Sequence, residues 1–118
     1  MKQNMPKNYI EFLKHISDEC KYLIGIVSSG ITKHDLLEDE TLKRAVVRSL
    51  EIIGEATKKI PADIKYNWDN INWKNMAGMR DKLIHDYFGI NYSIVWDVIK
   101  NKIPELSEQI EEVLKENH

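Results

Sequence analysis

One segment of the chain spaces its apolar and small residues so that they all fall on a single face of an α-helix. Between about Asp39 and Ile60 these residues recur at intervals of four and three, at Leu42, Val46, Ser49, Ile53, Ala56 and Ile60. An α-helix turns once in about 3.6 residues, so this spacing forms a continuous stripe. Such a stripe has to be covered by other elements, which makes helix packing the expected basis of the fold.

Gly54 lies beside this stripe and predicts a close contact. A glycine inside a helix costs about 1 kcal/mol relative to alanine. Its missing side chain, however, allows the backbone of a neighbouring segment to come near. We therefore expect another segment to approach the helix at Gly54, and we expect Pro61 to end the helix.

Helical spacing also predicts a helix before this segment and another after it. The first runs from Lys7 to Ser29 and has two adjacent apolar stripes, so it is expected to bury a wide face. Ser17 fills a gap in one of these stripes. The other helix is expected from about Asn72 toward Phe88, with Gly89 as its left-handed terminator.

The last predicted helix begins at Asn91, whose side chain can cap it, and it contains Pro104. Proline removes one helical hydrogen bond, so Pro104 either kinks this helix or restarts it as a first-turn residue. Strand-like alternation is not sustained anywhere in the 118 residues. We therefore predict an all-α fold, a small antiparallel bundle of four main helices, with residues 1–118 forming a single domain.

The charge balance limits how the chain can bind its partners. It has 17 Lys and Arg residues against 19 Asp and Glu residues, a formal net charge of −2. Non-specific nucleic-acid binding rests on excess positive charge, so any contact with RNA is expected in a local cleft. Cys20 is the only cysteine and the N-terminus is too polar for a signal peptide, which predicts a cytoplasmic location. Charges interrupt every apolar run, so no membrane span is expected.

The sequence predicts no metal site and no cofactor site. No cluster of cysteine, histidine and carboxylate residues has metal-ligand spacing, and the stretch from His34 to Glu40 is interpreted as a charged loop. Phosphate-binding loops and nucleophile elbows are absent, which argues against an NTPase or an acyl hydrolase. We expect His15, His34 and His118 to face solvent. Five aromatic residues are expected to pack in the core or an interface: Trp68, Trp73, Trp96, Tyr66 and Tyr92.

Arg80 lies near the centre of the apolar face of the predicted helix after Asn72, four residues after Met76 and four before Ile84. A charge directed into a core is costly unless it is paired. Two interpretations follow. Arg80 is either a structural residue tied to an acidic side chain or to helix carbonyls, or a guanidinium that lines a pocket or a subunit interface and can bind phosphate.

His85 and Tyr87 follow Arg80 on the same predicted helix. A separation of five residues rotates His85 by about 140° from Arg80, so the two side chains would not share a face. Tyr87 would share the face of Arg80, about 10 Å further along. For Arg80 and His85 to cooperate, either the helix unwinds near His85 or two subunits bring their motifs together, and the second possibility favours a homodimer.

The stretch from Asn75 to Phe88 resembles the signature R-x4-H-x-Y of HepT-like HEPN proteins, with Arg80, His85 and Tyr87 at its three positions. The resemblance extends to residues 48–56, 94–96 and 104–106, so it covers essentially the whole chain. Asp81 stands where family members often have asparagine. The resemblance implies the all-α, HEPN-like fold that the helical spacing also predicts.

The resemblance further implies the toxin of a type VII toxin–antitoxin pair, a homodimeric and metal-independent endoribonuclease that cleaves RNA such as tRNA or mRNA. Its antitoxin would be a minimal nucleotidyltransferase that transfers AMP from ATP to the motif tyrosine, here Tyr87, and so blocks the RNA site. The residue types suit this chemistry. His85 can carry protons, Arg80 can bind phosphate in a bidentate manner, and Asp81 can support the imidazole.

Two other functions are compatible with the same residues. One is a non-catalytic HEPN module that binds a nucleotide or RNA as an accessory subunit of its nucleotidyltransferase. The sequence pI of about 6.1 favours this module, because a free-standing ribonuclease is expected to have a more basic surface. The other is a plain helical dimerisation scaffold, which gives no purpose to Arg80 on an apolar stripe.

Overall fold

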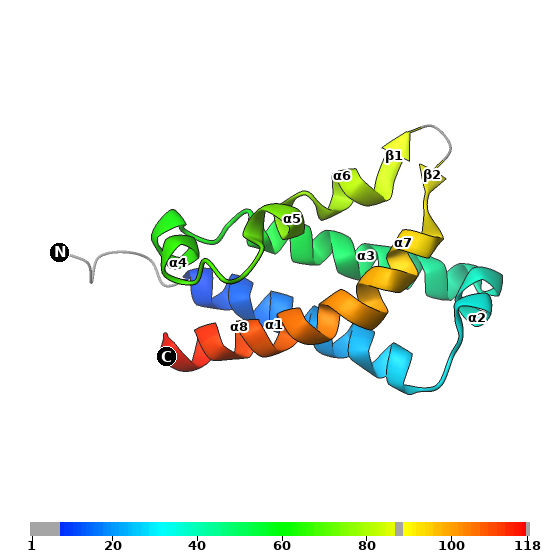
Figure 1. The fold of residues 1–118 in the computed structure, drawn as a ribbon, viewed down its shortest axis with the longest axis horizontal. Helices are drawn as coiled ribbons and strands as arrows, with labels where there is room; N and C mark the ends of the chain where they lie inside the picture. The colour runs from blue at the N-terminus through cyan, green and yellow to red at the C-terminus, as the bar shows by residue number, and fades with distance from the viewer. Residues whose placement is uncertain (1–7, 87–88, 118) are drawn as a thin grey trace.

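Three long helices pack side by side and form the body of the molecule (Figure 1). The computed structural model describes residues 8–86 and 89–117. The long helices are α1 (Asn8–Ser28), α3 (Glu40–Thr57) and α8 (Ile103–Glu116), and α1 contacts the other two while running in the opposite direction. The predicted all-α fold is confirmed. No helix in the described part of the chain is long and apolar enough to cross a membrane.

The core lies where the three long helices meet. The predicted stripe of α3 is buried over most of its length, and both predicted stripes of α1 contribute to a wide buried face. Each large apolar side chain buried in this way contributes about 1.5–3 kcal/mol relative to leaving it in water. The long helices supply most of the largest fully buried side chains: Leu13, Ile16, Leu23, Val46, Leu50, Ile53, Ile103 and Ile110.

Two buried serines link the long helices through carboxylates. The Ser17 hydroxyl in α1 donates a hydrogen bond to Glu111 in α8, and Lys21 Nζ lies 3.4 Å from the same carboxylate. The hydrogen bond from Ser17 and the positive charge of Lys21 hold the pKa of Glu111 below its ordinary value. The Ser49 hydroxyl in α3 donates to Glu19 Oε1 in α1 at 2.6 Å. Serine is therefore tolerated at these core positions because each hydroxyl has a partner.

The stretch expected to be a charged loop after α1 forms a short helix, so that prediction was wrong. This helix is α2 (Lys33–Glu38), and it begins with a capping box. The Asp35 N–H donates to the Thr32 hydroxyl at 3.1 Å, and the Thr32 N–H donates to the Asp35 carboxylate at 2.8 Å. The Thr-x-x-Asp spacing at residues 32–35 is the sequence signal that would have predicted this helix.

A second short helix follows α3. α3 ends at Thr57, earlier than the predicted end at Ile60, and the Thr57 hydroxyl donates to the Ile53 carbonyl at 2.7 Å. Pro61 then caps α4 (Ala62–Asn67). Pro61 therefore precedes the next helix, and the prediction that it ends the helix before it was wrong, because α3 already ends at Thr57.

The last predicted helix is divided into three parts. α7 (Tyr92–Asp97) is capped by the Asn91 side chain, as expected. The π-helical segment η2 (Val98–Lys102) follows, and the Ile103 N–H closes its wide turn by donating to the Val98 carbonyl. Pro104 lies in the first turn of α8, where its missing N–H has no helical partner to lose. Of the two predicted roles of Pro104, the structure therefore shows the first-turn role.

Candidate active site

The predicted helix from Asn72 toward Phe88 is interrupted, so that prediction was wrong in its length. Its start is correct, because the Asn72 side chain accepts a hydrogen bond from the Asn75 N–H at 3.1 Å and caps α5 (Trp73–Ala77). α5 ends at Ala77 with Gly78 as its C-cap, and α6 (Met79–Leu83) follows directly. Glycine has a poor helix propensity, which accounts for a break at residue 78.

The chain leaves the helical conformation after Leu83 and forms a small antiparallel pair of strands. These are β1 (Ile84–Asp86) and β2 (Gly89–Ile90), with Ile84 paired to Ile90 and an irregular register toward Asp86 (Figure 1). Gly89 has a φ of +91°, so its left-handed conformation is as predicted. Its role differs, because it begins β2 instead of ending a helix. We call α5, α6, β1 and β2 the motif arm.

Gly54 is where the motif arm rests on α3, and the predicted close approach is confirmed. A Cβ atom at Gly54 would lie 3.2 Å from the Met76 carbonyl oxygen and 3.7 Å from Met79 Cβ. Because glycine has no side chain, the end of α5 can sit this close to α3 without being displaced. Met76, Met79 and Leu83 are buried against the body, at 5%, 7% and 0% exposure. The apolar face predicted around Arg80 is therefore present at its described positions.

The motif residues lie on two different elements of the arm. The backbone of Arg80 belongs to α6 and the backbone of His85 to β1. The exposed Asp81 follows Arg80 in α6. Tyr87 and the side chains of Arg80 and His85 lie outside the described residues. Because α6 ends at Leu83, the rotation of about 140° expected on a continuous helix does not separate Arg80 from His85. A second subunit is not needed to resolve that conflict, and the homodimer stays a prediction.

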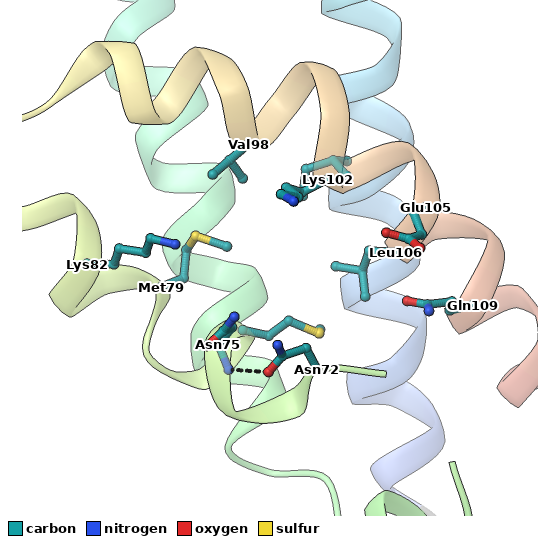
Figure 2. A pocket seen from close by; sticks show the side chains of 11 residues that line it. Asn72, Asn75, Met79, Lys82, Val98, Lys102, Glu105, Leu106 and Gln109 are labelled. Carbon is teal, nitrogen blue, oxygen red and sulfur yellow. Dashed lines mark hydrogen bonds between the residues drawn. The ribbon is translucent and has the colours of Figure 1, made fainter. Parts of the chain in front are cut away.

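A groove lies between the motif arm and the last helical segments (Figure 2). Its volume is about 200 Å³, and buried apolar side chains from both sides line it. Met79 and Lys82 of α6 face it from one side, and Lys102 of η2 faces it from the other. Sequence reasoning missed this groove because the two lysines are far apart in the chain. No spacing rule brings residues of α6 and η2 together, and only the packed fold does so.

The described residues contain no group of three or more His, Cys, Asp or Glu side chains arranged to hold a metal ion. Cys20 is buried, and burial together with the nearby negative charges of Glu19 and Glu111 raises its pKa to about 12. A thiol in this state is a poor nucleophile because it stays protonated. Cys20 is therefore not a candidate for nucleophilic catalysis.

The remaining residues that the sequence analysis considered are distributed over the body. His15 is exposed on α1, as expected, and His34 is exposed but lies on α2 instead of a loop. His118 lies outside the described residues. Trp73 is buried and its indole N–H donates to the Trp68 carbonyl at 2.9 Å, which confirms its packing role. Trp68, Trp96 and Tyr92 pack partly against the core. Tyr66 is 81% exposed, so it does not pack in the core, and the alternative that it packs in an interface stays a prediction.

The whole chain is similar to ribonucleases of one family. The model of the family described as "Ribonuclease HepT-like" matches residues 7–113, a range that includes Arg80, His85 and Tyr87. No solved structure shows a significant match to this chain. The resemblance predicted from the R-x4-H-x-Y signature is therefore confirmed at the level of the family.

Individual relatives agree with this match. A protein of Caldanaerobacter subterraneus subsp. tengcongensis named "Putative RNase TTE0752" is 51% identical over 88% of this chain and 92% of its own length. "Putative RNase MJ0127" of Methanocaldococcus jannaschii is 44% identical over 95% of this chain and 93% of its own length. "Probable ribonuclease HepT" of Thermococcus cleftensis is 40% identical over 94% of this chain and all of its own length. The chain belongs to the HepT-like ribonuclease family.

Proposed function

We propose that this protein is a metal-independent endoribonuclease and the toxin of a toxin–antitoxin pair that acts in the cytoplasm. The observation that carries the proposal is the family match over residues 7–113, which includes all three positions of the R-x4-H-x-Y signature. The fold supports it because the backbones of Arg80 and His85 lie in α6 and β1, and α6 borders a groove with two lysines. A local cleft of this kind suits a chain whose net charge is −2.

The proposed reaction uses the 2′-hydroxyl of RNA as the nucleophile. The 2′-oxygen bonds to the adjacent phosphorus, the bond from phosphorus to the 5′-oxygen breaks, and a 2′,3′-cyclic phosphate and a 5′-hydroxyl result. His85 accepts the proton of the 2′-hydroxyl and delivers it to the leaving 5′-oxygen, because histidine exchanges protons near neutral pH. Arg80 binds the phosphate oxygens and stabilises the extra negative charge of the transition state. Asp81 supports the imidazole in this proposal.

Regulation is proposed at Tyr87. A minimal nucleotidyltransferase antitoxin would transfer AMP from ATP, so that the Tyr87 phenol oxygen bonds to the α-phosphorus and pyrophosphate leaves. The attached AMP places negative charge and bulk beside the phosphate-binding residues, and RNA is excluded from the site. ATP is thus a reagent of the antitoxin, and the toxin itself requires no cofactor.

A homodimer is proposed as the active unit. In a two-fold symmetric dimer the same surface of each subunit faces the other, and two copies of the motif can border one cleft. Sedimentation velocity together with an RNA cleavage assay tests this. A protein that sediments as a monomer and retains full cleavage activity would exclude the dimer requirement.

The decisive experiment is cleavage of total RNA and tRNA by the purified, unmodified protein in excess EDTA. We expect wild type to cleave, and we expect Arg80→Ala and His85→Ala to lose at least about 100-fold in rate, because charge stabilisation and proton transfer each contribute on that order. Arg44→Ala and His15→Ala are matched controls, since both residues are exposed on the helical body. The controls should cleave like wild type.

The outcomes separate the candidate functions. Lack of cleavage by folded, unmodified wild type would favour the non-catalytic accessory module. Cleavage that stops in EDTA would exclude the metal-independent reaction. Growth arrest on expression, relieved by the neighbouring nucleotidyltransferase, would support the toxin. An AMP adduct that persists in Tyr87→Phe, measured by intact mass, would exclude Tyr87 as the acceptor.

A further inference from the structure

We propose that the groove between the motif arm and η2–α8 binds one nucleotide of single-stranded RNA, next to the bond that is cleaved. The inference rests on the proposed function and adds a substrate-binding site outside the R-x4-H-x-Y signature. Figure 2 shows the groove, with Met79 and Lys82 on the α6 side and Lys102 and Leu106 on the opposite side. Its residues come from segments 72–82 and 98–109, so it exists only in the folded chain.

The groove has an apolar floor of a size suited to a single base. Five buried side chains form this floor, each no more than 7% exposed: Met76, Met79, Val98, Ile103 and Leu106. Its volume of about 200 Å³ is below the roughly 300–1,000 Å³ of pockets that hold drug-sized ligands. An apolar floor accepts the flat face of any nucleobase, which is the sequence-tolerant mode of single-strand binding.

Two positive charges border this floor. Lys82 and Lys102 are both exposed, and neither makes an ion pair with a side chain that the structure describes. Glu105 is the single carboxylate among the described residues that line the groove, and it does not lie within 4.0 Å of either amine. Among the described side chains that line the groove, two lysines and one carboxylate leave a net positive charge, and RNA phosphates are the complementary ligand.

Amide side chains supply polar groups for a base edge. Asn75 lines the groove and its side chain is exposed. Gln109 uses its amide nitrogen to donate to the Asn70 carbonyl at 3.4 Å, which leaves its oxygen available as an acceptor. A base seated on the apolar floor can therefore meet both a donor and an acceptor, as a nucleobase edge requires.

The groove adjoins the motif through α6. Met79 and Lys82 belong to the same short helix as Arg80, and a helix rises only about 1.5 Å per residue. A larger hollow of about 490 Å³ on α8 is bordered instead by Glu108, Glu111 and Glu112. Its carboxylates would repel phosphate. We therefore assign RNA binding to the groove beside the arm because of its lysines and its place next to Arg80, although the hollow on α8 is larger.

Binding of a labelled single-stranded RNA with 2′-O-methyl groups tests the inference, because this RNA has no free 2′-hydroxyl and cannot be cleaved. Fluorescence anisotropy gives the Kd and its salt dependence. We expect the double variant Lys82→Gln/Lys102→Gln to raise the Kd at least about tenfold and to reduce the slope of log K against log salt by about 1.4, since each phosphate contact on a single strand contributes about 0.7. Lys82→Arg/Lys102→Arg should retain binding.

The matched control is Lys58→Gln/Lys59→Gln, which removes the same charge from exposed positions after α3. Its Kd should stay within about threefold of wild type. Equal losses in the groove and control variants would overturn the inference in favour of general electrostatic attraction. If wild type cleaves RNA but the groove variant binds and cleaves normally, the inference fails and the proposed ribonuclease stands. If wild type neither binds nor cleaves RNA, both fail.

Discussion

The helical body and the motif arm hold their shapes by different means. The body consists of helices of 14 to 21 residues, whose buried stripes run along most of their length. The arm is built from two five-residue helices and two short strands, and it rests on α3 through Gly54 and a few buried side chains. Arg80 and His85 therefore have their backbones in the part of the molecule with the shorter helices and fewer buried side chains.

The largest expected effect is on the stability of the body. Leu50→Ala removes a fully buried side chain from α3, and substitutions of this kind lower the free energy of unfolding by about 2–5 kcal/mol. Leu37→Ala is the matched control, because Leu37 is 39% exposed on α2, and it should cost less than about 1 kcal/mol. Urea unfolding followed by circular dichroism measures both. Equal losses would contradict the assignment of the core to the long helices.

Hydrogen exchange tests whether the arm opens separately from the body. The Lys82 N–H donates to the Gly78 carbonyl at 3.0 Å, so it is hydrogen-bonded like the amides inside α3. We expect it to exchange at least about tenfold faster than the amides of Leu50 and Ile53, a difference of about 1.4 kcal/mol in opening free energy. Equal protection would show that arm and body unfold as one unit.

A pair of glycines in two long helices isolates the contact between arm and body. Gly25→Ala in α1 places a methyl group in open space and should raise the free energy of unfolding by about 0.5–1 kcal/mol. Gly54→Ala gains the same helix propensity but sets the new Cβ 3.2 Å from the Met76 carbonyl oxygen. We expect this gain to be cancelled and RNA cleavage to fall, because the arm has to shift. Thermal unfolding and cleavage assays measure both variants.

The two glycine variants together show whether the contact at Gly54 positions the arm. If both variants are equally stabilised and equally active, the arm tolerates displacement from α3 and Gly54 does not position it. If only Gly54→Ala loses activity while both remain folded, the contact holds the arm in its active position.

The smallest expected effect is a pH-dependent change in the free energy of unfolding when Glu111 is replaced. The folded-state pKa of Glu111 is lowered, so its ionised form contributes stability above the unfolded-state pKa of about 4.3 and loses it as the pH falls through the folded-state pKa. Glu111→Gln should therefore differ most from wild type near neutral pH and converge with it below about pH 4. Urea unfolding at several pH values measures this, with the exposed Glu112→Gln as control. A constant difference across this range would contradict the role of Glu111.

The sequence predicted the body better than the arm, for a physical reason. Burial along a long helix repeats every three or four residues, so the stripe from Leu42 to Ala56 could be recognised without any partner. The same rule predicted one helix through residues 78–86, because Met76, Met79 and Leu83 continue the helical spacing. The break at Gly78 follows from the poor helix propensity of glycine, and the spacing of apolar residues does not record it. The strand at Ile84 is not recorded by this spacing either.

The candidate site divides in the same way. Arg80, His85 and Tyr87 could be selected because their order and separation form a recognisable signature. Lys82 and Lys102 could not, because lysines on exposed helix faces are common and these two come together only when η2 packs beside α6. Sequence reasoning therefore found the residues proposed for the reaction and missed those proposed for binding.

The π-helical turn has a consequence for how this protein can vary among its relatives. This turn contains one residue more than an ordinary α-helical turn, because the Ile103 N–H donates to the carbonyl of Val98, five residues earlier. A deletion of one residue within η2 would restore a regular helix and leave both α7 and α8 with their buried faces inward. Only the side chains on the turn itself, including Lys102, would change position. Insertions and deletions there can alter what the groove accepts while the packing of the body is preserved.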